Sequence, residues 1–211
     1  MLPDRSIMGK LSESCRIDMY HQGAALFSGK MKEKLFSEKF NLYDARNDIE
    51  HGVFAPFDFE GVEAASDRTE LIKNGVFCGL VSDLRNAKKY KASSTANGFR
   101  SFDSAVQIGF PGLQIGFGQR NFREILKDAG EVIVLDLAIG GDLTDLGDFS
   151  TPVQLGYLVK NGEVVGRLPE CSVSANIRNM FGSQLLEVAA NGPYNDCSTP
   201  YLLMEMDVQV H

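Results

Sequence analysis

Apolar and polar residues follow one another along much of this chain in patterns typical of β-strands. Two apolar runs are each interrupted by an Asn-Gly pair, Asn74-Gly75 and Asn161-Gly162, and each run resumes directly afterwards. Such a pair predicts a two-residue type I′ turn, because both central positions of that turn need a positive φ. We therefore predict β-hairpins over residues 69–81 and 154–168.

Other strands are expected where apolar residues run together or alternate. Residues 132–137 form a continuous apolar run, which is typical of a strand covered on both faces. Residues 202–210 alternate with a period of two, which is typical of a strand with one buried face. Shorter strands are expected at 40–44 and 113–117.

Residues that cap helices mark two of the expected helices. Asp83 and Asn121 each precede helix-forming residues, and their side-chain oxygens can accept hydrogen bonds from the free N–H groups of a first turn. The helices are expected over about 84–90, 122–127 and 176–180, the last with a continuation over 184–190, and a further short helix is expected at 30–36.

Together these elements predict a β-rich α+β fold. It has one domain with a mainly antiparallel sheet, several hairpins and about three short helices. The domain is expected over residues 21–211, because residues 1–20 lack clear periodicity and are expected to form a loosely held leader.

Composition narrows the range of functions. The chain has 211 residues, which is enough to bury a sizeable core without disulfides or metals. Its net charge of −7 argues against a broad nucleic-acid-binding face, because that affinity rests largely on lysine and arginine neutralising phosphates. The basic run at 85–91 is the best local candidate for phosphate binding, and a solvated helix face is the alternative.

The cysteines indicate a reducing compartment. Cys15, Cys78, Cys171 and Cys197 form no CxxC pair, and residues 1–9 lack the apolar stretch of a signal peptide. No apolar run approaches the ~20 residues that cross a bilayer. We therefore expect free thiols, a cytoplasmic location and no membrane partner.

Residues that could carry chemistry are sparse. His21, His51 and His211 are too far apart to share a helix face, so no metal site is expected from them. Cys197 lies in a polar loop and is a weak catalytic candidate, since no histidine is near it in sequence. The acidic stretch 142–148 lacks the glycine and glutamate of a calcium loop and is expected to be a turn.

Six short motifs nevertheless occur in an order that resembles one family, the TldD/PmbA family. Its members are described as modulators of DNA gyrase and as metallopeptidases, and the resemblance covers the family's C-terminal domain over about residues 20–210. The motifs are Asp58-Phe59-Glu60-Gly61-Val62, Leu71-Ile72-Lys73-Asn74-Gly75, Ser94-Thr95-Ala96-Asn97-Gly98-Phe99-Arg100, Gly147-Asp148-Phe149-Ser150, Lys160-Asn161-Gly162-Glu163 and Ser174-Ala175-Asn176-Ile177.

The departures from this family point to one of its branches. Family members are longer and carry an N-terminal α/β domain that this chain lacks. The TldD branch has the zinc-binding pattern H-E-x-x-x-H, but residues 14–19 of this chain read Ser-Cys-Arg-Ile-Asp-Met. Without those ligands and that general base, the resemblance implies a PmbA (TldE)-like subunit that is not catalytic alone. It would form a homo- or heterodimer and assist a TldD-type zinc peptidase in the proteolysis and maturation of peptides, with zinc in the partner only.

The resemblance also implies roles for individual residues. Cys197 falls in the loop where the TldD branch places a metal-binding cysteine. Asn97 and Arg100 match the S-T-G-N-x-R pattern and imply a loop that faces a substrate or partner, although Asn97-Gly98 also fits a simple turn. Ala96 replaces the glycine of that pattern.

Two other functions stay open at this point. One is an active hydrolase, which would use Cys197 with His21 or His51, or a metal site not recognised in the sequence. The other is modulation of DNA gyrase, for which the Lys88, Lys89 and Lys91 cluster would provide the contact.

Overall fold

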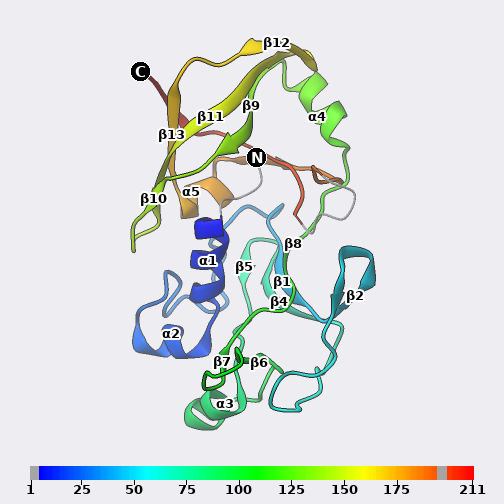
Figure 1. Ribbon diagram of the computed structural model, residues 1–211, viewed down its shortest axis with the longest axis vertical. Coiled ribbons are helices and arrows are strands. Elements are labelled where there is room, and N and C mark those ends of the chain that lie inside the picture. The colour runs from blue at the N-terminus through cyan, green and yellow to red at the C-terminus, as the bar shows by residue number, and fades with distance from the viewer. Residues whose placement is uncertain (1–4, 194–198) are drawn as a thin grey trace. The chain divides into compact units, whose positions relative to one another are not determined.

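The computed structural model describes residues 5–193 and 199–211, and Figure 1 labels most of its helices and strands. Within it the chain divides into two compact units. One comprises Gly9–Gly116, and the other comprises Phe117–His211 together with the residues before Gly9. The expected α+β class with mainly antiparallel pairing is confirmed. The described residues form five α-helices rather than three.

The unit Gly9–Gly116 is built on a four-stranded antiparallel sheet in the order β5-β4-β1-β8. Two small hairpins, β2–β3 and β6–β7, extend from it. The bounds are β1 (Leu42–Ala45), β2 (Asn47–Asp48), β3 (Val53–Phe54), β4 (Arg68–Lys73), β5 (Val76–Phe77), β6 (Gly98–Phe99), β7 (Gln107–Ile108) and β8 (Leu113–Ile115), with helices α2 (Ile17–Gln22), η1 (Ile49–His51) and α3 (Leu84–Tyr90).

The leader expected at residues 1–20 is instead mostly helical from Arg5 onward. Helix α1 covers Arg5–Ser14, and α2 begins at Ile17 after two intervening residues. Ile7, Leu11 and Cys15 recur at every fourth position, which is a helical spacing that the sequence analysis missed.

The helix expected at 30–36 does not form. Residues 24–41 follow an irregular path that places Phe27, Phe36 and Phe40 in the core, with ring centroids 5.3 Å apart in the pairs Phe27–Phe36 and Phe36–Phe40. The segment is fixed by backbone hydrogen bonds to the β4–β5 hairpin, because both Leu35 and Phe36 donate to the carbonyl of Gly75. Tertiary packing therefore outweighs the helix propensity of these residues.

The unit Phe117–His211 contains a six-stranded antiparallel sheet organised around one long strand, β11. The first half of β11 pairs with β10 and β13, its second half pairs with β9 and β12, and β16 pairs with β13. A two-stranded sheet, β14–β15, completes the unit. The bounds are β9 (Glu131–Ala138), β10 (Asp142–Leu143), β11 (Asp148–Lys160), β12 (Glu163–Arg167), β13 (Cys171–Asn176), β14 (Leu185–Val188), β15 (Leu202–Met204) and β16 (Asp207–Val210), with helices α4 (Phe122–Asp128) and α5 (Ile177–Phe181).

Both Asn-Gly hairpins are confirmed. The φ angles are 49° and 76° at Asn74 and Gly75, and 52° and 84° at Asn161 and Gly162, so each turn has positive φ at both central positions. The two predicted caps are also confirmed, because Asp83 and Asn121 each accept a backbone N–H of the helix that follows, and Asn176 caps α5 in the same way.

Three expectations in this second unit are wrong. Residues 185–188 form strand β14 and not a helix, because they pair with β15. The run 202–210 divides into two strands with different partners. Strand β9 is not covered on both faces, since Ile133 and Leu137 remain 37% and 44% exposed. Among the described residues, no helix is long and apolar enough to cross a membrane.

Candidate functional site

Asn97 lies in the loop formed by the motif at residues 94–100, and its side chain is only 1% exposed. Its Nδ2 donates to Asp44 Oδ2 at 2.8 Å and to the carbonyl of Gly109 at 2.6 Å. Its Oδ1 accepts from Thr95 Oγ1 at 2.7 Å. The Asn97 side chain therefore holds the loop from within, and that this loop faces a substrate or partner stays a prediction.

The carboxylate of Asp44 is the centre of this buried network. It forms an ion pair with Arg46 at 3.0 Å and accepts the backbone N–H of Gly112 at 3.0 Å. Burial raises the pKa of Asp44, while the Arg46 guanidinium and the N–H donors of Asn97 and Gly112 act in the opposite direction. The cost of burying these two charges is thus offset in part by their partners.

Two of the family motifs meet at this network. Asp58 Oδ2 accepts the backbone N–H of Gly98 at 2.9 Å, and Asp58 Oδ1 accepts those of Glu60 and Val62. A Cβ atom at Gly98 would lie 2.6 Å from Glu60 Oε2, so this position admits only glycine without movement of the Glu60 side chain. The motifs are thus interlocked parts of one structural element.

The backbone conformation of Ala96 explains why the family pattern has glycine at this position. Its φ is +59°, a left-handed conformation that costs a non-glycine residue about 1–2 kcal/mol. The backbone of the loop keeps this conformation in spite of the alanine. The replacement therefore leaves the shape of the loop intact.

The outer side of the same loop is apolar and aromatic. The rings of Phe59 and Phe99 are in edge-to-face contact at 5.2 Å, yet they remain 60% and 46% exposed. Phe57 and Phe102 are exposed nearby in the sequence, and Arg100 is exposed between Phe99 and Phe102. Exposed aromatic rings beside an arginine are the composition found at protein interfaces. That Arg100 faces a substrate or partner stays a prediction.

Residues 14–19 do not fit a zinc site. The segment ends α1 and begins α2, and Arg16 pairs with Asp18 at 2.7 Å. Cys15 is fully buried, and its burial raises the pKa of the thiol above its ordinary range. No cluster of three or more His, Cys, Asp or Glu side chains that could hold a metal occurs among the residues the structure describes.

Two of the other candidate ligands contact residues that are not metal ligands. His21 stacks on Tyr90 with ring centroids 4.5 Å apart, and His211 Nε2 lies 3.2 Å from Ser172 Oγ in the other unit. Cys197 lies outside the described residues.

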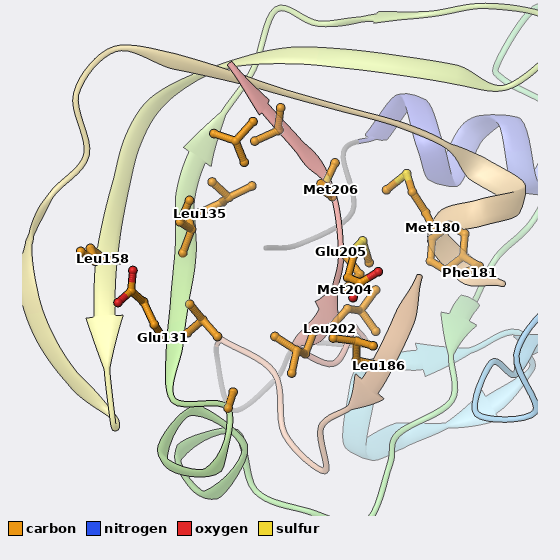
Figure 2. Close-up of a pocket in the computed structure, with 16 residues that line it drawn as sticks. Glu131, Leu135, Leu158, Met180, Phe181, Leu186, Leu202, Met204, Glu205 and Met206 are labelled. Atoms are coloured by element: carbon orange, nitrogen blue, oxygen red, sulfur yellow. The ribbon is translucent and has the colours of Figure 1, made fainter. Parts of the chain in front are cut away.

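A cavity of about 590 Å³ in the unit Phe117–His211 was not anticipated from the sequence. Figure 2 shows Leu135 and Leu158 on one side of it and Met180, Phe181 and Leu186 on the other. The consecutive residues 202–206 form another part of its wall. The cavity exists because the sheet turns apolar side chains toward a space that no described element fills, which is also why β9 is partly exposed.

Comparison with known proteins shows that this chain matches a protein family. Residues 5–210 match the family described as the PmbA/TldA metallopeptidase C-terminal domain. A metalloprotease of Archaeoglobus fulgidus is 31% identical over 157 residues, which is 74% of this chain and 36% of that protein.

Two solved structures share the fold. The crystal structure of TldE from Thermococcus kodakarensis aligns with a TM-score of 0.82 at 26% identity, over 97% of this chain and 48% of that one. A proposed modulator of a DNA gyrase from Thermotoga maritima aligns with a TM-score of 0.77 at 23% identity, over 97% of this chain and 47% of that one. The chain thus spans less than half the length of these proteins. Because the family match covers almost all of its residues, the chain belongs to the PmbA/TldD metallopeptidase family and corresponds to its C-terminal domain.

Proposed function

We propose that this chain is a TldE-like, non-catalytic C-terminal domain that pairs with a TldD-type zinc peptidase in the cytoplasm. In this role it assists the partner in the proteolysis and maturation of peptides. The observation that carries the proposal is the identity of residues 14–19, where a buried Cys15 and the Arg16–Asp18 ion pair stand in place of the histidines and glutamate of the catalytic pattern. A segment without imidazole or a spare carboxylate supplies neither zinc ligands nor a general base.

Similarity supports the choice of branch. The aligned Thermococcus kodakarensis protein is itself named TldE, and the alignment covers 97% of this chain. The exposed rings of Phe59 and Phe99 beside Arg100 suit the role of a subunit that works through contact with another protein. The dimer is thus the functional unit in this proposal.

The first test measures metal content and assembly. The purified chain is analysed for zinc by elemental analysis, then mixed at micromolar concentration with a TldD-type protein from the same organism, and the mass of any complex is measured by light scattering. We expect no stoichiometric zinc in the chain alone, a defined complex with the partner, and faster cleavage of an unstructured peptide by the complex than by the partner alone.

The active-hydrolase alternative predicts the opposite results. One zinc per chain, or cleavage by the isolated chain that is lost in Cys197→Ala or on adding a chelator, would overturn the proposal. So would the absence of any complex at micromolar concentration. The gyrase alternative predicts salt-sensitive DNA binding that falls when Lys88, Lys89 and Lys91 are replaced by glutamine.

A further inference from the structure

The chain contains four Asn-Gly pairs, and the structure holds them in different ways. The pairs are Asn74-Gly75, Asn97-Gly98, Asn161-Gly162 and Asn191-Gly192. Asn-Gly is a chemically labile sequence, because the glycine has no Cβ atom to hinder the attack of its backbone nitrogen on the side-chain carbon Cγ of the asparagine. The attack requires an asparagine side chain that is free to turn and a glycine N–H that is not bonded elsewhere.

Two of the four asparagine side chains are held by hydrogen bonds. Asn97 is 1% exposed and takes part in three side-chain hydrogen bonds, while the N–H of Gly98 donates to Asp58 Oδ2 at 2.9 Å. Asn191 Oδ1 accepts the backbone N–H of Phe122 at 2.8 Å. Neither side chain can turn toward the following glycine unless these bonds break.

The other two pairs form the hairpin turns, and they differ at the glycine. Gly75 is buried, its N–H donates to the carbonyl of Phe40 at 2.9 Å, and its own carbonyl accepts two further backbone N–H groups. Gly162 and Asn161 are both exposed, and the N–H of Gly162 has no hydrogen-bond partner among the described residues. Both turns have positive φ at their central positions. The surroundings of the glycine therefore distinguish them, and the type of turn does not.

We propose that Asn161 is the deamidation site of this chain. The nitrogen of Gly162 loses its proton to solvent and forms a bond to Asn161 Cγ. The bond from Cγ to the side-chain nitrogen breaks, ammonia leaves, and a cyclic succinimide remains. Water then opens the ring at either carbonyl, which yields aspartate or isoaspartate without any oxidant or reductant. The N–H of Asn161 donates to the carbonyl of Gly130 at 2.6 Å, but this bond uses none of the reacting atoms.

The conversion changes the β11–β12 hairpin in two ways. Isoaspartate carries the main chain through its side chain, so it adds a methylene group to a two-residue turn whose geometry needs positive φ at both positions. Either product also adds a negative charge between Lys160 and Glu163. The reaction thus alters both the shape and the charge of the turn that joins β12 to β11. This inference does not depend on the proposed pairing with a zinc peptidase.

The test is a prolonged incubation of the whole folded chain at neutral pH, followed by digestion and mass spectrometry of the peptides that contain the four pairs. Deamidation changes the mass of a peptide by the difference between a hydroxyl and an amino group. An isoaspartyl methyltransferase with a labelled methyl donor counts the isoaspartate separately. We expect Asn161 to convert at least about tenfold faster than Asn74, Asn97 or Asn191, because each of those must first break a further hydrogen bond.

The same incubation in urea separates the effect of the structure from that of the local sequence. The unfolded chain lacks the hydrogen bonds that distinguish the four pairs, so their rates should agree within about threefold. Two variants complete the test on the folded chain. Asn161→Gln should abolish the fast conversion, because glutamine would have to close a larger ring. Asn74→Gln is the matched change in the other hairpin turn and should leave the fast conversion unaltered.

Three results would overturn the inference. One is a folded chain in which Asn74, Asn97 or Asn191 converts as fast as Asn161. The second is an Asn161 that stays intact in the folded chain over an incubation that converts all four pairs in urea. The third is an order of rates in urea that equals the order in the folded chain, since the local sequence would then determine the rates.

Discussion

The amide nitrogen of Asn97 donates a 2.8 Å hydrogen bond to the buried carboxylate of Asp44, which lies 53 positions earlier in the chain. The contact joins the loop of one family motif to strand β1 of the sheet. It gives Asn97 a structural role that can be separated experimentally from any role of its exposed neighbour Arg100.

Asn97→Ala should destabilise the protein by about 2–3 kcal/mol, because it removes one hydrogen bond from each of the buried groups of Asp44, Thr95 and Gly109. Urea denaturation measures the change. Arg100→Ala is the control and should stay within about 0.5 kcal/mol, since Arg100 is exposed. Equal effects of the two variants would contradict the structural role of Asn97.

Asp44→Asn should be more harmful, at about 3–5 kcal/mol, because Arg46 would keep its positive charge in the interior without its ion-pair partner. Adding Arg46→Met to this variant should restore part of the loss, and thermal unfolding of the four proteins in the cycle gives the coupling energy. A double variant no more stable than Asp44→Asn would show that the ion pair is not the source of the effect.

The two Asn-Gly hairpins should respond differently to the same substitution. Gly75 and Gly162 have similar positive φ angles, but a Cβ at Gly75 would lie 2.2 Å from the carbonyl oxygen of Phe36, and one at Gly162 would meet nothing closer than 3.6 Å. Gly162→Ala should therefore cost only the left-handed strain of about 1–2 kcal/mol. Gly75→Ala should cost at least twice as much, as measured by chemical denaturation, and a similar loss at both sites would argue against the close approach.

The Arg16–Asp18 pair should contribute to stability in a pH-dependent way. Burial alone would raise the pKa of Asp18, but its hydrogen bond and ion pair with Arg16 and the N–H of Met19 outweigh burial and lower that pKa below its ordinary value. The folded state thus favours ionised Asp18 more than the unfolded state does. The stabilisation is full above the unfolded pKa, near about pH 4, and is lost as the pH falls through the lower folded value.

Asp18→Asn should accordingly be less stable than the parent protein at neutral pH, with a difference that shrinks below about pH 4. Unfolding curves of both proteins across this range provide the measurement. A difference that grows on acidification would reverse the sign assigned to the pKa shift.

Local signals were predictable from the sequence, and the elements defined by tertiary contacts were not. The turns at Asn74 and Asn161 and the caps at Asp83 and Asn121 depend on a few neighbouring residues, so they could be predicted. Strand β14 depends on its pairing with β15, which competes with the helix propensity of its residues.

The candidate sites follow the same division. Asp44 and Arg46, two positions apart beside an apolar run, were a signal of a buried ion pair that the sequence analysis did not use. The cavity could not be predicted, because its walls come from segments spread over residues 129–208 and the pattern of a strand does not say which part of its apolar face is left uncovered.

The hydrogen bonds of Asp44 join residues that are far apart in the sequence, and this has a consequence for the order of folding. Its partners Asn97 and Gly112 lie 53 and 68 positions away, so this network closes only after large loops have lost their entropy. The β11–β12 hairpin, by contrast, closes across the two residues Asn161 and Gly162 and can form in microseconds. During refolding, the amide hydrogens of β12 should therefore become protected from exchange well before the N–H of Gly112. At that stage the chain would contain a formed β11–β12 hairpin while the carboxylate of Asp44 is still hydrated.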